Sequence, residues 1–431
     1  MDHAHNKITK CFLLLLLLTS CSPRPEKQLV SILENRYANL YVNDQRQKRE
    51  VIKELATYLN DHKFNDKNLK EIKSLVHKIN DGHVVLFDDR KDKNIVYSSG
   101  VHFIPGSIFI KDCADCSPSL AEDKYEISEV NGLPLKAWLE KEKFYVAASS
   151  PWGRHHRLIN TLGTRADNQD ITLKVKSSSG KIALTKLNWH VQSNTPPVCV
   201  SGQRLNENVF KINVDNLWCE DTTGKVPWSR DLIYSNFKKQ FDDSTASIKE
   251  NDRIIIDLRN NGGGGDSEVE YVLNAFNEKS VFMYHYKYLR KTNPGKRKWL
   301  EKFWPFKLDL WAKDEFDYTN LKNKPKKTFF DNKVVTMISA GCFSSCETIA
   351  SALKLEKRSL VIGSRTHGGS GDPVIFPIRG THYSINIPTC ITWQENGRFY
   401  EGSGVHPDQE VLQSPILKTD NVLMTAIDLV Q

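Results

Sequence analysis

The residues best placed to do chemistry are two adjacent serines, Ser344 and Ser345, inside the segment Val334–Leu355. An apolar run there ends in small residues and the serine pair, then resumes with helical spacing, which predicts a strand, a tight turn and a helix. A hydroxyl at the start of a helix faces N–H groups that have no partner within the helix, and it faces the positive end of the helix dipole. Both stabilise a developing alkoxide or oxyanion, so the position suits a serine nucleophile.

The same residues also have a purely structural interpretation. Ser344 followed three residues later by Glu347 fits a capping box, in which the serine caps the helix and the glutamate reaches back to the serine backbone. For this segment taken alone, a simple helix cap is the more frequent explanation. The choice therefore depends on whether the rest of the chain supplies the other groups of a catalytic site.

Three further segments carry residues of that kind. Asp257–Gly265 follows a buried strand and ends in four glycines, which let the backbone turn sharply and bring N–H groups close to a bound atom. It lacks the Lys-Ser/Thr and the GxGxxG spacing of phosphate loops. His83 follows an Asp-Gly pair at a predicted helix-to-strand junction, and Glu401 opens the glycine-rich turn Glu401–Asp408. Each feature alone is also compatible with a flexible turn, a structural histidine or a solvated carboxylate.

In this order and spacing, the segments resemble the tail-specific, or C-terminal processing, serine peptidase family. That family has a DLRxNGGG strand and loop, a nucleophile in an SxxE turn and a late ExxGVxPD turn. The matching segments here are Asp257–Gly264, Ser344–Glu347 and Glu401–Asp408. The resemblance implies an α/β catalytic core that hydrolyses peptide bonds without a metal, nucleotide or other cofactor.

The resemblance also implies a role for each matching residue. The family nucleophile lies three residues before the glutamate, which selects Ser344 over Ser345. Ser345 would then supply a backbone N–H to the oxyanion hole, and either Gly262 or Gly263 would supply the second.

The chain departs from the Ser-Lys branch of the family, because Gly369 stands where that branch has its base lysine. The tricorn-like branch instead uses Ser, His and Glu, and His83 and Glu401 match its positions. An imidazole can take the serine proton at neutral pH, and a carboxylate can fix its tautomer and stabilise the imidazolium. The tricorn core protease has a serine directly before its histidine, where this chain has Gly82. His367, in the loop that replaces the lysine segment, is the alternative base.

The elements that must position these residues follow from the hydrophobic pattern. Helical periodicity predicts three helices between Lys27 and Asn80, and from there to about Val200 strands dominate. Within that block, Tyr125–Glu142 contains a strand, an Asn-Gly turn and a short helix. This unit is similar to part of the PDZ-like modules of the family, which bind peptides at a sheet edge.

Strand and helix alternate after about Val209, which predicts an α/β core. We therefore expect a multidomain α/β protein. Its predicted parts are a signal peptide at 1–21, a helical region at 22–88, a β-rich PDZ-like region at 89–200 and an α/β peptidase core at 201–431.

The N-terminus predicts export. The apolar stretch Cys11–Leu18 follows basic residues, is too short to span a bilayer, and ends in Leu-Thr-Ser-Cys21. This ending resembles a bacterial lipobox, in which Cys21 becomes the lipidated first residue; an ordinary cleaved signal peptide is the alternative. The resemblance implies a lipid-anchored protein of the cell envelope, with Ser22 typical of sorting to the outer membrane facing the periplasm.

The composition restricts the classes of function that fit this chain. The 431 residues carry a net charge of +8 with both signs interspersed, so no nucleic-acid-binding stripe stands out. The densest basic stretch, Lys287–Lys302, is interpreted as a solvated loop or hairpin, with contact to a membrane or an acidic substrate as the alternative. Nine cysteines fit an exported protein. Cys342 and Cys346 flank the serine turn and could bridge across it, whereas the pair at 113 and 116 lacks the partners of a zinc site.

Two functions of different class are thus predicted. The first is a lipid-anchored serine endopeptidase that acts on polypeptides through an acyl-enzyme on Ser344. The second is a non-catalytic peptide- or ligand-binding protein on the same scaffold, because a fold alone does not ensure activity. An esterase is a more distant option, since no GxSxG elbow is present.

Overall fold

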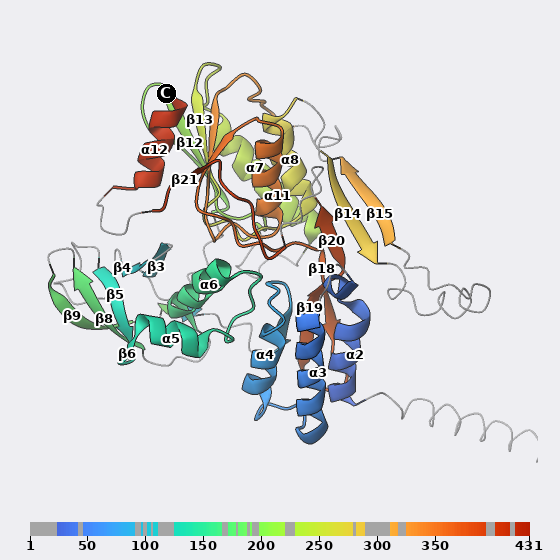
Figure 1. Ribbon diagram of the computed structural model, residues 1–431. Helices are drawn as coiled ribbons and strands as arrows, with labels where there is room; N and C mark the ends of the chain where they lie inside the picture. Colours follow the sequence, from blue (N-terminus) through green and yellow to red (C-terminus); the bar gives the residue numbers. More distant parts are fainter. Residues whose placement is uncertain are drawn as a thin grey trace, which may run out of the picture.

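The structure of the chain is a computed structural model (Figure 1). It describes residues 24–41, 46–90, 125–165, 171–177, 180–187, 198–219, 229–278, 282–288, 311–317, 325–393, 401–413 and 419–431, together with short strands at 96–97, 101–104, 107–110 and 190–191. The signal peptide with Cys21, the cysteines at 113 and 116 and most of the basic stretch at 287–302 lie outside these residues.

Three helices form the N-terminal layer, as the periodicity predicts. They are α2 (Pro25–Arg36), α3 (Arg46–Asp61) and α4 (Leu69–His77), with a short 3₁₀ turn η1 (Ala38–Tyr41) after the first. Their apolar faces meet in one buried core that contains Leu33 and Leu55. The same core includes Ile385 and Ile387 from far along the chain. The helical layer is therefore completed by C-terminal residues and does not form a core by itself.

The C-terminal residues in that core belong to a three-stranded antiparallel sheet. Its strands are β1 (Val85–Asp88), β19 (Tyr383–Pro388) and β18 (Pro373–Pro377), in the order β1-β19-β18. Val85 pairs with Asn386, and Asn386 also donates from Nδ2 to the His83 carbonyl at 3.1 Å. This sheet thus fixes the position of His83, which lies just before β1.

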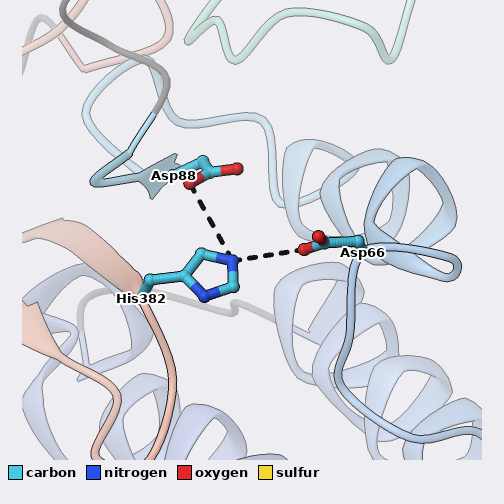
Figure 2. Close-up of side chains that lie close together, drawn as sticks. All are labelled: Asp66, Asp88 and His382. Atoms are coloured by element: carbon cyan, nitrogen blue, oxygen red, sulfur yellow. Dashed lines mark hydrogen bonds and ion pairs between the residues drawn. The ribbon is translucent and has the colours of Figure 1, made fainter.

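A cluster of polar side chains links the helical layer to this three-stranded sheet (Figure 2). His382 Nε2 lies 3.2 Å from an Asp66 oxygen and 3.9 Å from an Asp88 oxygen. The ligand atoms are within 4.8 Å of one another, a spacing that a metal would require. Arg90, however, already contacts Asp66 at 2.9 Å and Asp88 at 3.1 Å. We interpret the cluster as an ion-pair network, of modest strength because three of its members are partly exposed.

The middle of the chain is built on a second antiparallel sheet. Its strands are β3 (Val101–Ile104), β4 (Ser107–Ile110), β5 (Tyr125–Val130), β8 (Ile171–Ser177) and β9 (Ile182–Leu187), with β6 (Leu133–Pro134) on β5. Asn131 and Gly132 form the predicted turn, with positive φ angles of 50° and 77°. Helix α5 (Leu135–Glu142) follows as expected. Helix α6 (Pro151–Gly163) contradicts the expectation that strands dominate here, although Pro at its first position is a known start signal.

The last part is the predicted α/β core. Its sheet has the order β11 (Val200–Arg204), β12 (Val209–Val214), β13 (Arg253–Asp257), β16 (Val334–Ile338), β17 (Leu360–Gly363), β21 (Gln409–Glu410). All neighbours from β12 to β21 are parallel. The helices are α7 (Arg230–Thr245), α8 (Asp266–Phe276), α11 (Ser345–Leu355) and α12 (Asn421–Val430).

Helices cover both faces of this sheet (Figure 1). Ile254 and Ile256 pack into the core shared with α7, α8 and α11, whereas Ile255 packs with Val422 and Val430 of α12. This alternation follows from the two-residue period of a strand. Because β13 and β16 are parallel neighbours, the glycine loop and the serine turn that come after them emerge at the same edge.

The remaining strands form two small antiparallel groups. β14 (Phe282–Tyr288) pairs with β15 (Trp311–Asp317) and β20 (Cys390–Trp393), and β2 (Val96–Tyr97) pairs with β7 (Thr164–Arg165) and β10 (His190–Val191). Among the residues that the structure describes, two disulfides join Cys199 to Cys219 and Cys342 to Cys346. In the described part of the chain, no helix has the length and apolarity needed to cross a bilayer.

Candidate active site

Ser344 stands on a sharp turn between β16 and α11. It is the N-cap of α11 and has φ 58° and ψ −125°, a backbone conformation that non-glycine residues rarely adopt. Such outliers persist only where the surroundings enforce them, and they concentrate at functional sites. Part of the enforcement comes from Gly263, where an added Cβ would lie 2.7 Å from the Phe343 carbonyl and 2.9 Å from Ser344 Cβ. The glycine loop therefore packs directly against the serine.

His83 reaches Ser344 from the other side of the site. Its Nε2 lies 3.1 Å from Ser344 Oγ, although the two residues are 261 positions apart in the chain. The His83 backbone N–H donates to Asp81 at 2.9 Å, and the imidazole stacks on Phe343 with ring centres 4.4 Å apart. Backbone and ring are thus both held, so the imidazole is positioned before any substrate binds.

The surroundings keep His83 neutral. Burial lowers its pKa to about 4, and the positive charge of Arg157 acts in the same direction, while Asp81 opposes them. Arg157 is itself held by bonds to the Gly82 and Ala147 carbonyls and lies 4.5 Å from the Phe343 ring centre. A neutral imidazole whose Nε2 faces a hydroxyl can act as a general base.

Glu401 lies in the same region, but no hydrogen bond joins it to His83. One of its oxygens accepts from the Ser370 N–H at 2.7 Å. Its other oxygen, and Nδ1 of His83, are buried atoms without a hydrogen-bond partner among the described residues. The Ser370 carbonyl lies near enough to the imidazole to favour its protonated form. The backbone of Ser370 thus interacts with both Glu401 and His83.

Burial raises the pKa of Glu401 well above its ordinary value, and the negative charge of Asp81 raises it further. Asp81 is itself fully paired, because it accepts from Tyr37 and Asn39, both at 2.8 Å, and from the His83 backbone. The motifs in the sequence did not predict a role for Asp81. The available signal was its position two residues before His83.

The candidate oxyanion donors differ in availability. The Gly263 N–H already donates to Asn261 Oδ1 at 2.8 Å, which favours Gly262 as the donor from the glycine loop. Ser345 occupies the first helical position of α11, where an N–H has no acceptor inside the helix. Its hydroxyl is used differently, donating to the Gly264 carbonyl at 2.7 Å.

Glu347 locks the serine turn to the loop after β17. Its buried carboxylate accepts from the backbone N–H groups of Ser344, Gly368 and Gly369 at 3.2, 2.8 and 2.7 Å, and from the Thr366 hydroxyl. Burial raises its pKa to about 7, while these donors lower it. The capping interaction expected from the sequence is thus present together with the catalytic geometry, and the two interpretations do not exclude each other.

The structure separates His367 from the serine. Phe343 lies between the two histidines, with its ring centre 4.6 Å from that of His367. Burial lowers the pKa of His367 well below its ordinary value, and its Nε2 has no hydrogen-bond partner among the described residues. His367 therefore packs inside the loop, and of the two candidate bases only His83 is within reach of Ser344.

A cavity of about 770 Å³ lies near the site, although Ser344, His83 and Glu401 do not line it. It lies between α4, β1 and the segment 141–147, and Arg157, which contacts the Gly82 carbonyl, lines it. A space of this kind next to a strand edge is large enough for several residues of an extended peptide.

The chain is similar to known peptidases in sequence and in fold. Residues 229–411 match the model of peptidase family S41. A carboxy-terminal-processing protease of Bartonella bacilliformis is 26% identical over 185 residues, which are 41% of this chain and 37% of that protein. The chain thus spans less than two fifths of the curated relative it matches.

Solved structures share the fold. The crystal structure of mature CPAF superposes with a TM-score of 0.64 at 16% identity, over 90% of this chain and 92% of that one. A putative peptidase from Parabacteroides merdae gives a TM-score of 0.52 at 17% identity, over 95% and 97% of the two chains. The shared fold and the match at residues 229–411 make this chain similar to the serine-type peptidases of family S41.

Proposed function

We propose that the chain is a serine endopeptidase of the Ser-His-Glu type, in which Ser344 is the nucleophile, His83 the general base and Glu401 the supporting carboxylate. The observation that carries the proposal is the 3.1 Å contact between His83 Nε2 and Ser344 Oγ, on a turn whose backbone is strained. A helix cap needs no imidazole at its hydroxyl, so this contact favours catalysis over a structural role.

In the reaction we propose, Ser344 Oγ attacks the carbonyl carbon of a peptide bond while its proton moves to His83 Nε2. The tetrahedral oxyanion accepts hydrogen bonds from the N–H groups of Gly262 and Ser345, each worth about 10²–10³-fold in rate. Collapse breaks the C–N bond, and the leaving amine takes the proton from His83. Water, deprotonated by the same imidazole, then hydrolyses the acyl-enzyme and restores Ser344.

Glu401 acts in this scheme on the imidazolium, the form of His83 that exists only during turnover. An ionised Glu401 favours that positive charge, and the Ser370 N–H holds the carboxylate in place. The substrate is a polypeptide, which the cavity beside β1 accommodates in extended form. The PDZ-like character of the middle sheet is part of the proposal, with peptide docking at one of its edges.

The proposed location is the bacterial cell envelope, with a lipid on Cys21 anchoring the chain to the outer membrane. The lipobox-like sequence and the two disulfides, which form in oxidising compartments, support it. Expression of the full chain with a clickable fatty acid tests this. We expect label in the parent and none in Cys21→Ala; label that persists in the variant would contradict the anchor.

The function itself is tested with a fluorophosphonate probe on protein that lacks residues 1–21. We expect labelling of the parent and of Ser345→Ala, and none of Ser344→Ala or His83→Ala. Labelling that survives Ser344→Ala but not Ser345→Ala would show the register to be wrong. Cleavage of unfolded protein and of small esters is measured in parallel. A folded parent that neither labels nor cleaves would instead support the non-catalytic binding protein.

A further inference from the structure

The cavity of about 770 Å³ lies between the helical layer and the middle region of the chain. Helix α4 forms one wall, strand β1 a second, and the segment 141–147, which begins at the end of α5, a third. Arg157 of α6 also lines it, and its guanidinium donates to the Gly82 carbonyl at 2.7 Å. Because β1 begins two residues after His83, the base is about 7 Å from the start of this strand along an extended chain. The cavity is therefore well placed to bind a part of the substrate close to the bond that is cleaved.

Three cations at this cavity form no ion pair with a carboxylate of the described residues. Two of them, Lys70 of α4 and Lys141 of α5, have exposed side chains. The third, Arg157, is held by the carbonyls of Gly82 and Ala147, and both of these hydrogen bonds use its Nη1. A guanidinium has five N–H donors, so Nη2 and Nε of Arg157 keep donors for a ligand.

The negative charges at the cavity are fewer. Four cations, counting Lys73, and three carboxylates line it. Two of the carboxylates, Asp66 and Asp88, contact Arg90 at 2.9 and 3.1 Å, within the ion-pair network described above. The third carboxylate is Glu142. Positive charge therefore exceeds negative charge along these walls, and this imbalance favours a ligand that carries negative charges.

The rest of the lining suits a polypeptide. Leu69 and Val146 provide apolar surface beside the cations, and Tyr145, another lining residue, is 44% exposed. In the described part of the chain β1 pairs with β19 alone, so the strand has a second edge at which an extended chain can add. A peptide can use this edge and the apolar surface together, while its alternate side chains point toward the walls.

We propose that this cavity binds an acidic segment of the polypeptide substrate, whose Asp and Glu side chains pair with Lys70, Lys141 and Arg157. The inference rests on the proposed function, because it treats the bound chain as a substrate. It adds selection by charge, since segments rich in carboxylates are attracted and basic segments are repelled. Neither the nucleophile nor the base provides such a selection.

The test is peptide binding to the full chain with Ser344→Ala, in detergent, so that the bound peptide is not cleaved. Three fluorescent peptides carry Glu, Gln or Lys at alternate positions, and both ends are blocked so that only side chains are charged. Fluorescence anisotropy gives each Kd. We expect the Glu peptide to bind roughly tenfold more tightly than the Gln peptide, and the Lys peptide to bind most weakly. High salt should reduce the difference, because exposed charges are screened.

The double variant Lys70→Glu/Lys141→Glu should abolish the preference for the Glu peptide. Its matched control is Lys67→Glu/Lys136→Glu, which changes the net charge equally at exposed lysines on or next to the same two helices. Lys67 and Lys136 do not line the cavity, so the control should keep each Kd within twofold. With Ser344 intact, cleavage of the Gln peptide should stay within twofold of the parent in both double variants.

Equal affinity for the Glu and Gln peptides would overturn the proposal, and so would equal losses in the two double variants. An oligonucleotide that binds as tightly as the Glu peptide, and is lost in the first variant, would show that the ligand is not a peptide. If circular dichroism shows that the first variant does not fold, Lys70→Gln/Lys141→Gln takes its place, and an unchanged preference there would count against the proposal. A parent that binds the Glu peptide but never reacts with the fluorophosphonate probe would refute only the proposed function.

Discussion

The two halves of the candidate site are held very differently. On the nucleophile side, the Cys342–Cys346 disulfide spans the turn, Glu347 pairs with four donors around it, and Gly263 packs against it. On the side of the base, His83 Nδ1 and one oxygen of Glu401 are buried without a hydrogen-bond partner among the described residues.

This difference in hydrogen bonding shows which part of the candidate site is already complete in the folded protein. Buried polar groups are normally satisfied, and exceptions point to a group that changes its interactions in use. In the proposed mechanism, the turn that carries Ser344 is already formed in the folded protein, whereas the support of the imidazolium by Glu401 remains incomplete until a proton moves. Variants on the two sides should therefore fail in different ways.

The largest effect is expected from His83→Ala. Because His367, the other candidate base, does not reach Ser344, kcat/KM should fall by about 10⁴-fold or more, as for loss of a triad member. Cleavage of an unfolded protein substrate measures it, with His367→Ala as the matched histidine control. A greater loss in His367→Ala than in His83→Ala would reverse the assignment of the base.

Glu347→Ala should affect stability and activity together. It leaves four donors around the serine turn without an acceptor, at a cost of about 3–5 kcal/mol by urea unfolding, and it should abolish labelling of Ser344. Asp252→Ala is the matched control, because that buried carboxylate pairs with Arg204 at the opposite end of β13. It should lose stability but keep labelling. Normal labelling of folded Glu347→Ala would show that the turn does not depend on this residue.

The two disulfides allow a direct comparison. Replacing Cys342 and Cys346 by alanine should cost about 2 kcal/mol and slow labelling of Ser344, whereas replacing Cys199 and Cys219, 20 residues apart, should cost about 3 kcal/mol. The second variant should label at the parental rate below its unfolding transition. Equal labelling rates in both variants would mean that the first disulfide does not shape the turn.

Glu401→Gln should have a smaller effect than His83→Ala. A carboxylate in direct contact with the base is worth about 10⁴-fold. Because no hydrogen bond joins Glu401 to His83 in the structure, we expect a loss of only about 10–10²-fold in kcat. Stopped-flow measurement of acylation determines the value. A loss as large as that of His83→Ala would indicate a direct contact during turnover.

The smallest effect concerns pH. In Glu401→Gln, where that carboxyl no longer titrates, labelling of Ser344 should change less than twofold between pH 7.5 and 5.5, because the pKa of His83 is about 4, whereas an ordinary histidine would lose roughly tenfold. Below pH 6.5, the unfolded chain binds more protons at His83, His77 and His156 than the folded chain does. The contribution of these neutral histidines to the free energy of unfolding is therefore lost as the pH falls through about 4. Circular dichroism at each pH separates unfolding from titration.

Local patterns predicted much of this structure. Apolar spacing identified α2, α3 and α4, and the strand-helix alternation identified the core, because periodicity reports which face of an element is buried. Pairings across the chain were not accessible in this way. The packing of β19 against the helical core was not predicted, because it joins segments far apart in the chain. Helix α6 was not predicted either, because the strand-like patterns around it were stronger than its own start signal.

For the site, the sequence by itself determined the residue types and their order: a serine before a helix, a glycine loop after a strand, and a histidine and a glutamate in family-like motifs. Only the tertiary structure placed Phe343 between the two histidines, engaged the Gly263 N–H with Asn261, and brought Lys70, Lys141 and Arg157 to one cavity. These outcomes depend on side-chain packing between segments distant in the chain, whereas the motifs depend on backbone conformations that neighbouring residues dictate.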